Sequence, residues 1–268
     1  MIKDADMNIH PTAIVDKEAD LGSGVEVKAF TMIEAGAQIG DGCVIGPHAV
    51  VRCHTIIGED NQIHTGAVLG EPPQDRKYKG EPTKLIIGRN NIIREYVTIH
   101  RASGEGNQTL MGDDNMLMAY SHVGHNCRIG NATLIANSAG LSGHCVIEDY
   151  VNVGGMVGMH QYVTIGTMAM VGGMSRLARD VPPYVLVEGN PVETHGINWR
   201  GLSRRGVSSE DRAELKKAYR LLYRSQYNIN DALAIIEREL RQTKEIVYLG
   251  DFLRRVHAGY AGRQTDPH

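Results

Sequence analysis

Residues 123–153 read VGHNCRIGNATLIANSAGLSGHCVIEDYVNV. Every sixth residue of this stretch is aliphatic, from Val123 to Val153. The same phase extends in both directions and fills 26 of the 29 positions between residues 9 and 177, whereas a hydrophobic content of 42% would fill about 12 by chance. The aliphatic positions outside the quoted stretch are Ile9, Val15, Leu21, Val27, Ile33, Ile39, Ile45, Val51, Ile57, Ile63, Leu69, Ile87, Ile93, Ile99, Met111, Leu117, Met159, Ile165, Val171 and Leu177.

A period of six excludes an α-helix, because a helical stripe needs a spacing near 3.6 residues. A β-strand has a period of two, so a chain that turns a corner every six residues can keep each aliphatic side chain pointing inward. Small residues such as Ala13, Cys43 and Thr133 stand four positions after the aliphatic ones and suit a tight corner. Three hexads then make one triangular coil of 18 residues. We predict a mainly β fold, a parallel β-helix in which each coil packs on its neighbours.

The pattern also divides the chain. Three positions (75, 81 and 105) break the phase, so we expect projecting loops near residues 71–85 and 101–110. The hexads stop after Pro182-Pro183, which predicts a β-helix domain over 1–190 and a helical C-terminal domain over 191–268. Helices are expected over 211–227, over 231–241 after a cap at Asn230, and over 244–256 after Thr243.

Composition limits the possible functions. Residues 1–190 hold 14 Lys+Arg against 21 Asp+Glu, and residues 191–268 hold 14 against 10. The basic C-terminal part could attract an acidic partner, although a solvated helical surface explains the count equally well. The four cysteines show no C-x-x-C spacing, and neither a signal peptide nor a membrane span is evident. We expect a soluble cytoplasmic protein without stable membrane insertion, nucleic acid, metal or cofactor.

Polar residues 18 apart predict a site, because such residues lie about 4.8 Å above one another in successive coils. Nine residues fall into three neighbouring columns and are expected to form one outward-facing patch, with His122 close by: Asn126, His144 and Tyr162; His125, Gly143 and Gln161; Gly124, Ser142 and His160. A histidine can accept a proton at neutral pH, and a bare glycine N–H can stabilise an oxyanion. Acyl transfer by direct attack of the acceptor hydroxyl fits this pair. Ordinary surface histidines or a zinc site are the alternatives.

Motifs in the loops and the tail resemble a known family, the UDP-N-acetylglucosamine O-acyltransferases that start lipid A synthesis. The resemblance runs nearly end to end. It rests on GEPPQD at 70–75, KYKGEPT at 77–83, IREYVTIHR at 93–101, HVGHNC at 122–127, GG at 172–173, DVPPY at 180–184, GN at 189–190, GL at 201–202 and RRG at 204–206. It implies a left-handed β-helix and a homotrimer with clefts between subunits. It also implies an acyl carrier protein as donor and the sugar 3-position as acceptor.

By the same resemblance, His125 is the general base and the Gly143 N–H stabilises the oxyanion. The remaining roles are binding ones, and the resemblance distributes them over the loop, the coils and the tail: Asp75, Lys77, His122, Asn126, His144, His160, Gln161, Asn198, Arg204 and Arg205. Gly155 and Gly173 share a column, and the family pattern links Gly173 to longer acyl chains.

Three positions depart from the family pattern. Asn126 follows the catalytic histidine where some relatives have Asp, Pro191 replaces a histidine, and Arg200 stands where others have an acid. An Asp–His dyad is therefore not expected here. The residues leave the acceptor open between a 3-hydroxyl and a 3-amino sugar. A zinc carbonic anhydrase of the hexapeptide class, using His125, His144 and His160, and a non-catalytic scaffold are further alternatives.

Overall fold

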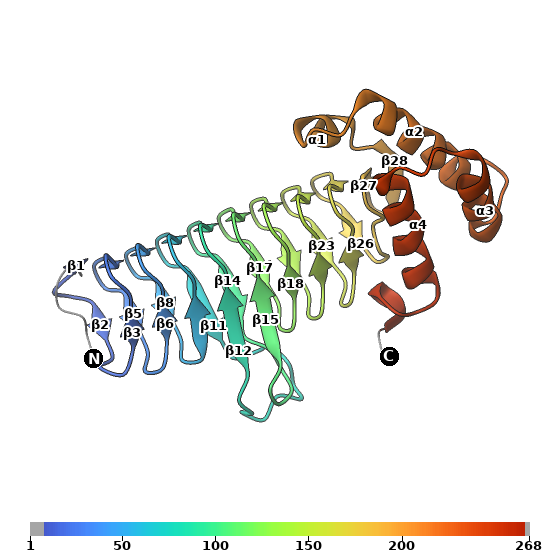
Figure 1. Cartoon of the computed structure of the whole chain (residues 1–268). Helices are drawn as coiled ribbons and strands as arrows, with labels where there is room; N and C mark the ends of the chain where they lie inside the picture. Colours follow the sequence, from blue (N-terminus) through green and yellow to red (C-terminus); the bar gives the residue numbers. More distant parts are fainter. Residues whose placement is uncertain (1–7, 266–268) are drawn as a thin grey trace.

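The computed structural model describes residues 8–265. The chain winds into a left-handed parallel β-helix whose three flat faces are parallel sheets (Figure 1). The predicted fold class is confirmed. We name the faces sheets I, II and III, in the order in which the chain passes through them.

Sheet I has eleven strands: β1 Asn8–Ile9, β4 Glu26–Val27, β7 Val44–Ile45, β10 Gln62–Ile63, β13 Ile92–Ile93, β16 Met116–Leu117, β19 Leu134–Ile135, β22 Asn152–Val153, β25 Met170–Val171, β27 Val185–Gly189 and β28 Val192–Ile197. Sheet II has nine: β2 Ile14–Val15, β5 Met32–Ile33, β8 Val50–Val51, β11 Val68–Glu71, β14 Thr98–His100, β17 His122–Val123, β20 Gly140–Leu141, β23 Gly158–Met159 and β26 Arg176–Leu177. Sheet III has eight: β3 Asp20–Leu21, β6 Gln38–Ile39, β9 Thr55–Ile57, β12 Lys84–Ile87, β15 Gln108–Met111, β18 Arg128–Ile129, β21 Val146–Ile147 and β24 Thr164–Ile165.

The strand register shows the 18-residue winding directly. Arg128 pairs with Val146, and Val146 pairs with Thr164. In each two-residue strand the second residue points inward. Almost every one of these inward aliphatic side chains is buried, Ile45, Leu117 and Ile135 among them. Each such side chain contributes about 1.5–3 kcal/mol by leaving water. Ile9 remains 36% exposed, because no coil among the described residues lies beneath it.

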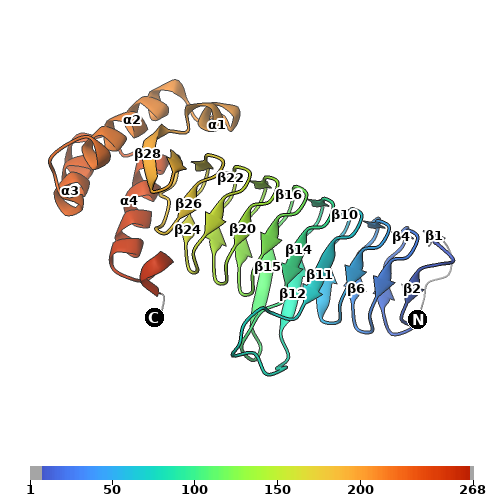
Figure 2. The same ribbon diagram turned by 180° about the vertical axis from the view of Figure 1, so that it is seen from behind.

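Two loops project from the β-helix without disturbing its phase (Figures 1 and 2). Gln62 pairs with Ile92, thirty residues later, and Ile92 pairs with Met116, twenty-four residues later. The insertions therefore amount to two hexads and one hexad. The loops occupy residues 72–83 and 101–107, a narrower span than expected, because Leu85 and Thr109 are buried strand residues.

An asparagine ladder runs up the corner between sheets III and I. The side-chain oxygen of Asn61 accepts hydrogen bonds from the backbone and side-chain N–H groups of Asn91, and Asn91 in turn accepts from the Asn115 backbone. The oxygen of Asn115 accepts from the N–H and hydroxyl of Thr133. These four residues are buried, and each rung satisfies the polar groups of the next.

The helical part covers the C-terminal end of the coils (Figure 1). It contains α1 Trp199–Arg204, α2 Ser209–Tyr223, α3 Ile229–Glu239, α4 Lys244–His257 and the 3-10 turn η1 Gly262–Thr265. Thr243 caps α4 as predicted, but the cap predicted at Asn230 is wrong, because Asn228 caps α3 by accepting from Asp231 N. The sequence pattern missed α1 and the antiparallel β27–β28 hairpin. The hairpin turn contains the expected domain boundary between residues 190 and 191.

Candidate active site

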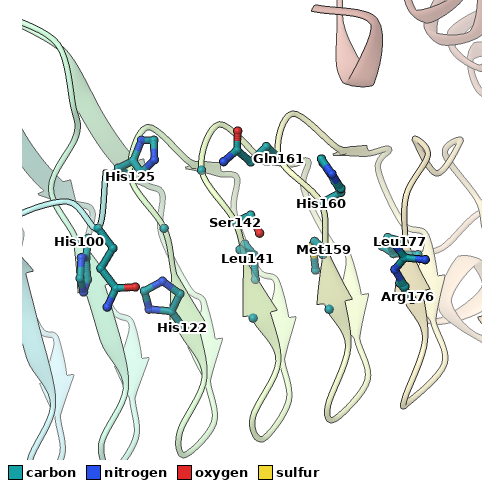
Figure 3. Close-up of a pocket in the computed structure, with 15 residues that line it drawn as sticks. His100, His122, His125, Leu141, Ser142, Met159, His160, Gln161, Arg176 and Leu177 are labelled. Atoms are coloured by element: carbon teal, nitrogen blue, oxygen red, sulfur yellow. The ribbon is translucent and has the colours of Figure 1, made fainter. Parts of the chain in front are cut away.

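A pocket of about 600 Å³ lies on the outer side of sheet II (Figure 3). Five successive coils contribute to it, those of β14, β17, β20, β23 and β26, together with the loop after β11. His100, His122 and His125 lie at one end of the view and Arg176 at the other, with Ser142 and His160 between them. The lining residues are Gln74, His100, His122, Gly124, His125, Gly140, Leu141, Ser142, Gly143, Gly158, Met159, His160, Gln161, Arg176 and Leu177.

Asn126 fixes the protonation pattern of His125. The Asn126 Oδ1 accepts from the Ser103 N–H (2.9 Å), and its Nδ2 donates to the Ser103 carbonyl (3.0 Å). These two backbone groups determine which amide atom is oxygen. Because that oxygen lies 2.8 Å from His125 Nδ1 and can only accept, Nδ1 carries the proton of the neutral ring. Nε2 is thereby left with a lone pair, as a general base requires.

Gly143 lies directly beneath this imidazole. A Cβ at Gly143 would stand 2.6 Å from both Nε2 and Cε1 of His125, so only glycine fits. Among the hydrogen bonds of residues 8–265, the Gly143 N–H has no acceptor. A proton acceptor and a free backbone donor therefore face the same small volume, which suits a reaction that develops an oxyanion.

The other two histidines at this end are held neutral. His122 Nδ1 lies 2.7 Å from Thr98 Oγ1, and burial, with neighbouring His100 and His125, lowers the pKa of His122 to about 4. Burial also lowers the pKa of His100, whose ring meets that of His122 edge to face at 5.1 Å. Neutral rings can donate and accept hydrogen bonds, which favours binding of uncharged polar groups here.

The projecting loops hold Asp75 beside this end of the pocket. The Lys77 N–H and the Ser103 hydroxyl donate to the Asp75 carboxylate at 2.9 and 2.7 Å. These bonds lower the pKa of Asp75. Ser103 thus links the carboxylate to Asn126. Asp75 and Lys77 are next to the pocket, but Gln74 is the residue of this loop that lines it.

The predicted nine-residue patch bends around a corner at His125, where the Asn126 amide and the edge of the His144 ring, 5.2 Å away between ring centres, both meet the imidazole. Gly124, His125, Ser142, Gly143, His160 and Gln161 line the pocket, but His144 and Tyr162 lie around the corner between sheets II and III. Their rings stack on each other at 4.5 Å and line a separate cavity against α4 and η1. All three residues of this column have a positive φ, +61° at Asn126, +62° at His144 and +64° at Tyr162, so the chain turns at this position in each coil.

Several predicted residues lie away from the pocket of their own chain. Asn198 is buried, accepts from Gly201 N and donates to the Met168 carbonyl, so it caps α1. Arg204 is exposed at the end of α1, and the Arg205 guanidinium lies 4.4 Å from the centre of the Tyr150 ring. Gly155 and Gly173 share the corner between sheets I and II, at the other edge of sheet II.

Sequence reasoning missed the floor and the far end of the pocket. Gly140, Gly158 and Arg176 follow His122 in register on successive coils, so the 18-residue spacing was the available signal. Neither glycine needs its conformational freedom: φ is not positive, and an added Cβ would meet nothing within 4 Å. A groove floor without side chains explains both. His100 and Gln74 follow no column, because an insertion separates them from the regular coils.

Within residues 8–265, no group of three or more His, Cys, Asp or Glu side chains is arranged to hold a metal ion. No helix in the described part of the chain is long and apolar enough to cross a bilayer.

The hexad coils and this pocket define a class, the hexapeptide-repeat acyltransferases. The family described as bacterial transferase hexapeptide (six repeats) matches residues 18–53 and 108–143, and the one described as UDP-N-acetylglucosamine O-acyltransferase, domain 2, matches residues 180–261. LpxA from Acinetobacter baumannii is 39% identical, with a TM-score of 0.89 over 92% of this chain and 96% of that chain.

Two further solved structures agree. LpxA from Bacteroides fragilis, a UDP-N-acetylglucosamine acyltransferase, is 39% identical (TM-score 0.90), and the Arabidopsis UDP-N-acetylglucosamine acyltransferase is 33% identical (TM-score 0.82). Each match covers 92% of this chain and 96% of the other. The chain belongs to the UDP-N-acetylglucosamine acyltransferase family and is an acyltransferase.

Proposed function

We propose that this enzyme transfers a 3-hydroxyacyl chain from acyl carrier protein to the 3-hydroxyl of UDP-N-acetylglucosamine. This is the first step of lipid A biosynthesis, and we place it in the cytoplasm. The observation that carries the proposal is the pairing of His125 Nε2, left unprotonated by Asn126, with the unbonded N–H of Gly143 directly below it.

The proposed reaction has two proton transfers. His125 Nε2 takes the proton of the sugar 3-hydroxyl while that oxygen bonds to the thioester carbonyl carbon. The Gly143 N–H stabilises the resulting oxyanion. When the intermediate collapses, the carbon–sulfur bond breaks and the sulfur takes the proton back from Nε2. The products are the sugar ester and the free carrier thiol, without an acyl-enzyme, a metal or a cofactor.

Asn126 supports this reaction differently from an aspartate. Its amide holds the ring and fixes the tautomer, but it adds no negative charge to stabilise imidazolium. Asp75, Lys77, His122, His160 and Gln161 are proposed to hold the sugar nucleotide near this end of the pocket. His144 is proposed to hold the sugar nucleotide from the corner beside the base, because its ring lies 5.2 Å from that of His125, edge to face.

A homotrimer is proposed from the apolar edge between sheets I and II. Its corner side chains are exposed in the single chain, from 50% at Tyr96 to 72% at Met174. Phe30, Tyr120 and Met156 belong to the same row and are exposed by about the same amount. A monomer rarely leaves so long an apolar row in water, and a second copy is the occupant that fits the repeating geometry.

The trimer would also account for the residues that lie away from the pocket. A neighbouring copy packed along this edge could bring Asn198, Arg204 and Arg205 to the nucleotide, and Gly155 and Gly173 to the acyl chain. The excess of basic residues in 191–268 suits docking of the acidic acyl carrier protein. We propose residues 1–190 as the acyltransferase domain and 191–268 as the domain that covers its end and assists binding.

The trimer has its own test. Tyr120→Glu combined with Met156→Glu places charges on the proposed interface, whereas Gln38→Glu places one on exposed sheet III. Light scattering after gel filtration should show dissociation for the first variant and a trimer for the control. A wild-type monomer at micromolar concentration would contradict the assembly.

The activity is tested by offering UDP-N-acetylglucosamine and its 3-amino analogue with a series of acyl carrier protein thioesters, followed by mass spectrometry of the products. We expect an ester at the 3-position of the hydroxyl sugar. Exclusive amide formation would replace the proposed acceptor with the amino sugar. His125→Ala should reduce the rate by about 10²–10⁴-fold, whereas exposed His195→Ala should not. A near-normal rate in folded His125→Ala would refute the assigned base.

A further inference from the structure

His100 occupies a protected position in the pocket. It is the last residue of β14, it is only 5% exposed, and it nevertheless lines the cavity next to His122 (Figure 3). Its ring therefore borders the pocket while being shielded from bulk water.

The two ring nitrogens of His100 differ. One ring N–H is hydrogen-bonded to Pro72, which offers only its carbonyl oxygen. Nδ1 has no hydrogen-bond partner within residues 8–265, so the donor to Pro72 is Nε2. Since burial lowers the pKa of His100, the ring is neutral and Nδ1 carries a lone pair.

The surrounding polar groups do not satisfy this lone pair. His122 uses its Nδ1 with Thr98, and the Asn126 amide is shared between His125 and Ser103. A buried acceptor without a donor is costly, and natural proteins rarely leave one unexplained. A ligand that supplies an O–H or N–H group here would recover that free energy.

We propose that His100 Nδ1 accepts a hydrogen bond from a neutral hydroxyl or amide N–H of a bound substrate, which makes His100 a specificity-determining residue. This inference rests on the proposed function, because it takes the substrates from it. Two donors have the required chemistry: a hydroxyl or the acetamido N–H of the nucleotide sugar, and the 3-hydroxyl of the acyl chain.

Two substitutions separate the two nitrogens. Glutamine places an amide nitrogen near the position of Nε2, so His100→Gln keeps the donor to Pro72 and removes the acceptor. Asparagine places an amide oxygen near the position of Nδ1, so His100→Asn keeps the acceptor and loses the bond to Pro72. His100→Gln should lower kcat/KM about 3- to 10-fold, the worth of one neutral hydrogen bond. His100→Asn should retain more activity despite a lower Tm.

The identity of the donor follows from paired substrates. If the acyl hydroxyl is the donor, His100→Gln loses activity with 3-hydroxyacyl carrier protein but not with the unsubstituted acyl donor. If the sugar is the donor, the loss is equal with both, and UDP-N-acetylglucosamine raises the Tm of His100→Gln less than that of the wild type. Wild-type kinetics of His100→Gln with every substrate would overturn the proposal. An inactive wild-type enzyme would instead count against the proposed function.

Discussion

Removal of the Asn126 side chain is the sharpest test of how the base is prepared. Asn126→Gly suits the site, because φ is +61° there and glycine adopts this conformation without strain. The change removes three hydrogen bonds: one to His125 Nδ1 and two to the Ser103 backbone. At about 1 kcal/mol each, the variant should lose about 2–3 kcal/mol of unfolding free energy. For a chain of this size that corresponds to a fall in Tm of about 4–12 °C.

The effect on catalysis should be indirect. Without the Asn126 oxygen, the His125 ring can rotate and place its proton on Nε2, where it blocks general-base catalysis. We expect the rate constant of the acyl-transfer step to fall about 10- to 100-fold, below the full contribution of a general base. Rates of single turnover with saturating acyl carrier protein thioester, measured well below the variant's Tm, would give this number without interference from product release.

A double-mutant cycle distinguishes positioning from binding. If Asn126 acts through His125, then Asn126→Gly should have no further effect on the rate of the His125→Ala enzyme. Rate losses that simply multiply in the double variant would refute the reasoning, as would a normal rate in the single variant. The Tm losses should fall short of additive by the one hydrogen bond that both changes remove, between Asn126 and His125, whereas the loss of the two Ser103 bonds should appear in full.

Three further outcomes follow from the geometry. Gly158→Leu should fold normally, since its Cβ has open space, but should reduce kcat/KM at least tenfold because the side chain fills the groove floor. Gly196→Ala, also at an open position, is the control, and unchanged kinetics of Gly158→Leu would contradict the assignment of the groove as the substrate site. Burial lowers the pKa of His122 to about 4, so its neutral ring favours the folded state above pH 6.5, and stability is lost as the pH falls toward 4. His122→Asn should therefore flatten the dependence of Tm on pH between 6.5 and 4, and an unaltered slope would assign the loss elsewhere. Gly173→Met should shift selectivity toward shorter acyl donors in a competition assay, because the bare corner at Gly173 is proposed to admit the chain; equal selectivity would remove Gly173 from that role.

The repeat made most of the fold predictable from the sequence. Period six sets the strands, the corners and the 18-residue register, and the phase resumes after each loop because both insertions are multiples of six. The helical part was less accessible. Asn228 and Asn230 both precede an apolar helical pattern, and only the backbone conformation identifies Asn228 as the cap. Helix α1 is six residues long, too short for a periodic signal.

The site was predictable where it follows the columns and unpredictable where it does not. The stacking of His125 over Gly143 comes directly from the spacing of 18. The different surroundings of Asn126 and His144 do not follow from it, because the two residues share a column and a positive φ, yet only His144 lines the cavity against α4. His100 and Ser103 were missed because they sit beside an insertion, where sequence distance no longer gives height along the axis.

The asparagine ladder has a consequence for how the molecule opens. A solenoid unfolds most easily from an exposed end, one coil at a time. Hydrogen bonds among Asn61, Asn91, Asn115 and Thr133 connect the coils from which both loops emerge. Loss of any one of these residues leaves the buried polar groups of its neighbours without hydrogen-bond partners. Unfolding that begins near Ile14 should therefore stop at the asparagine ladder. The reacting groups lie beyond it, in a stretch that thermal unravelling of the N-terminal coils leaves intact.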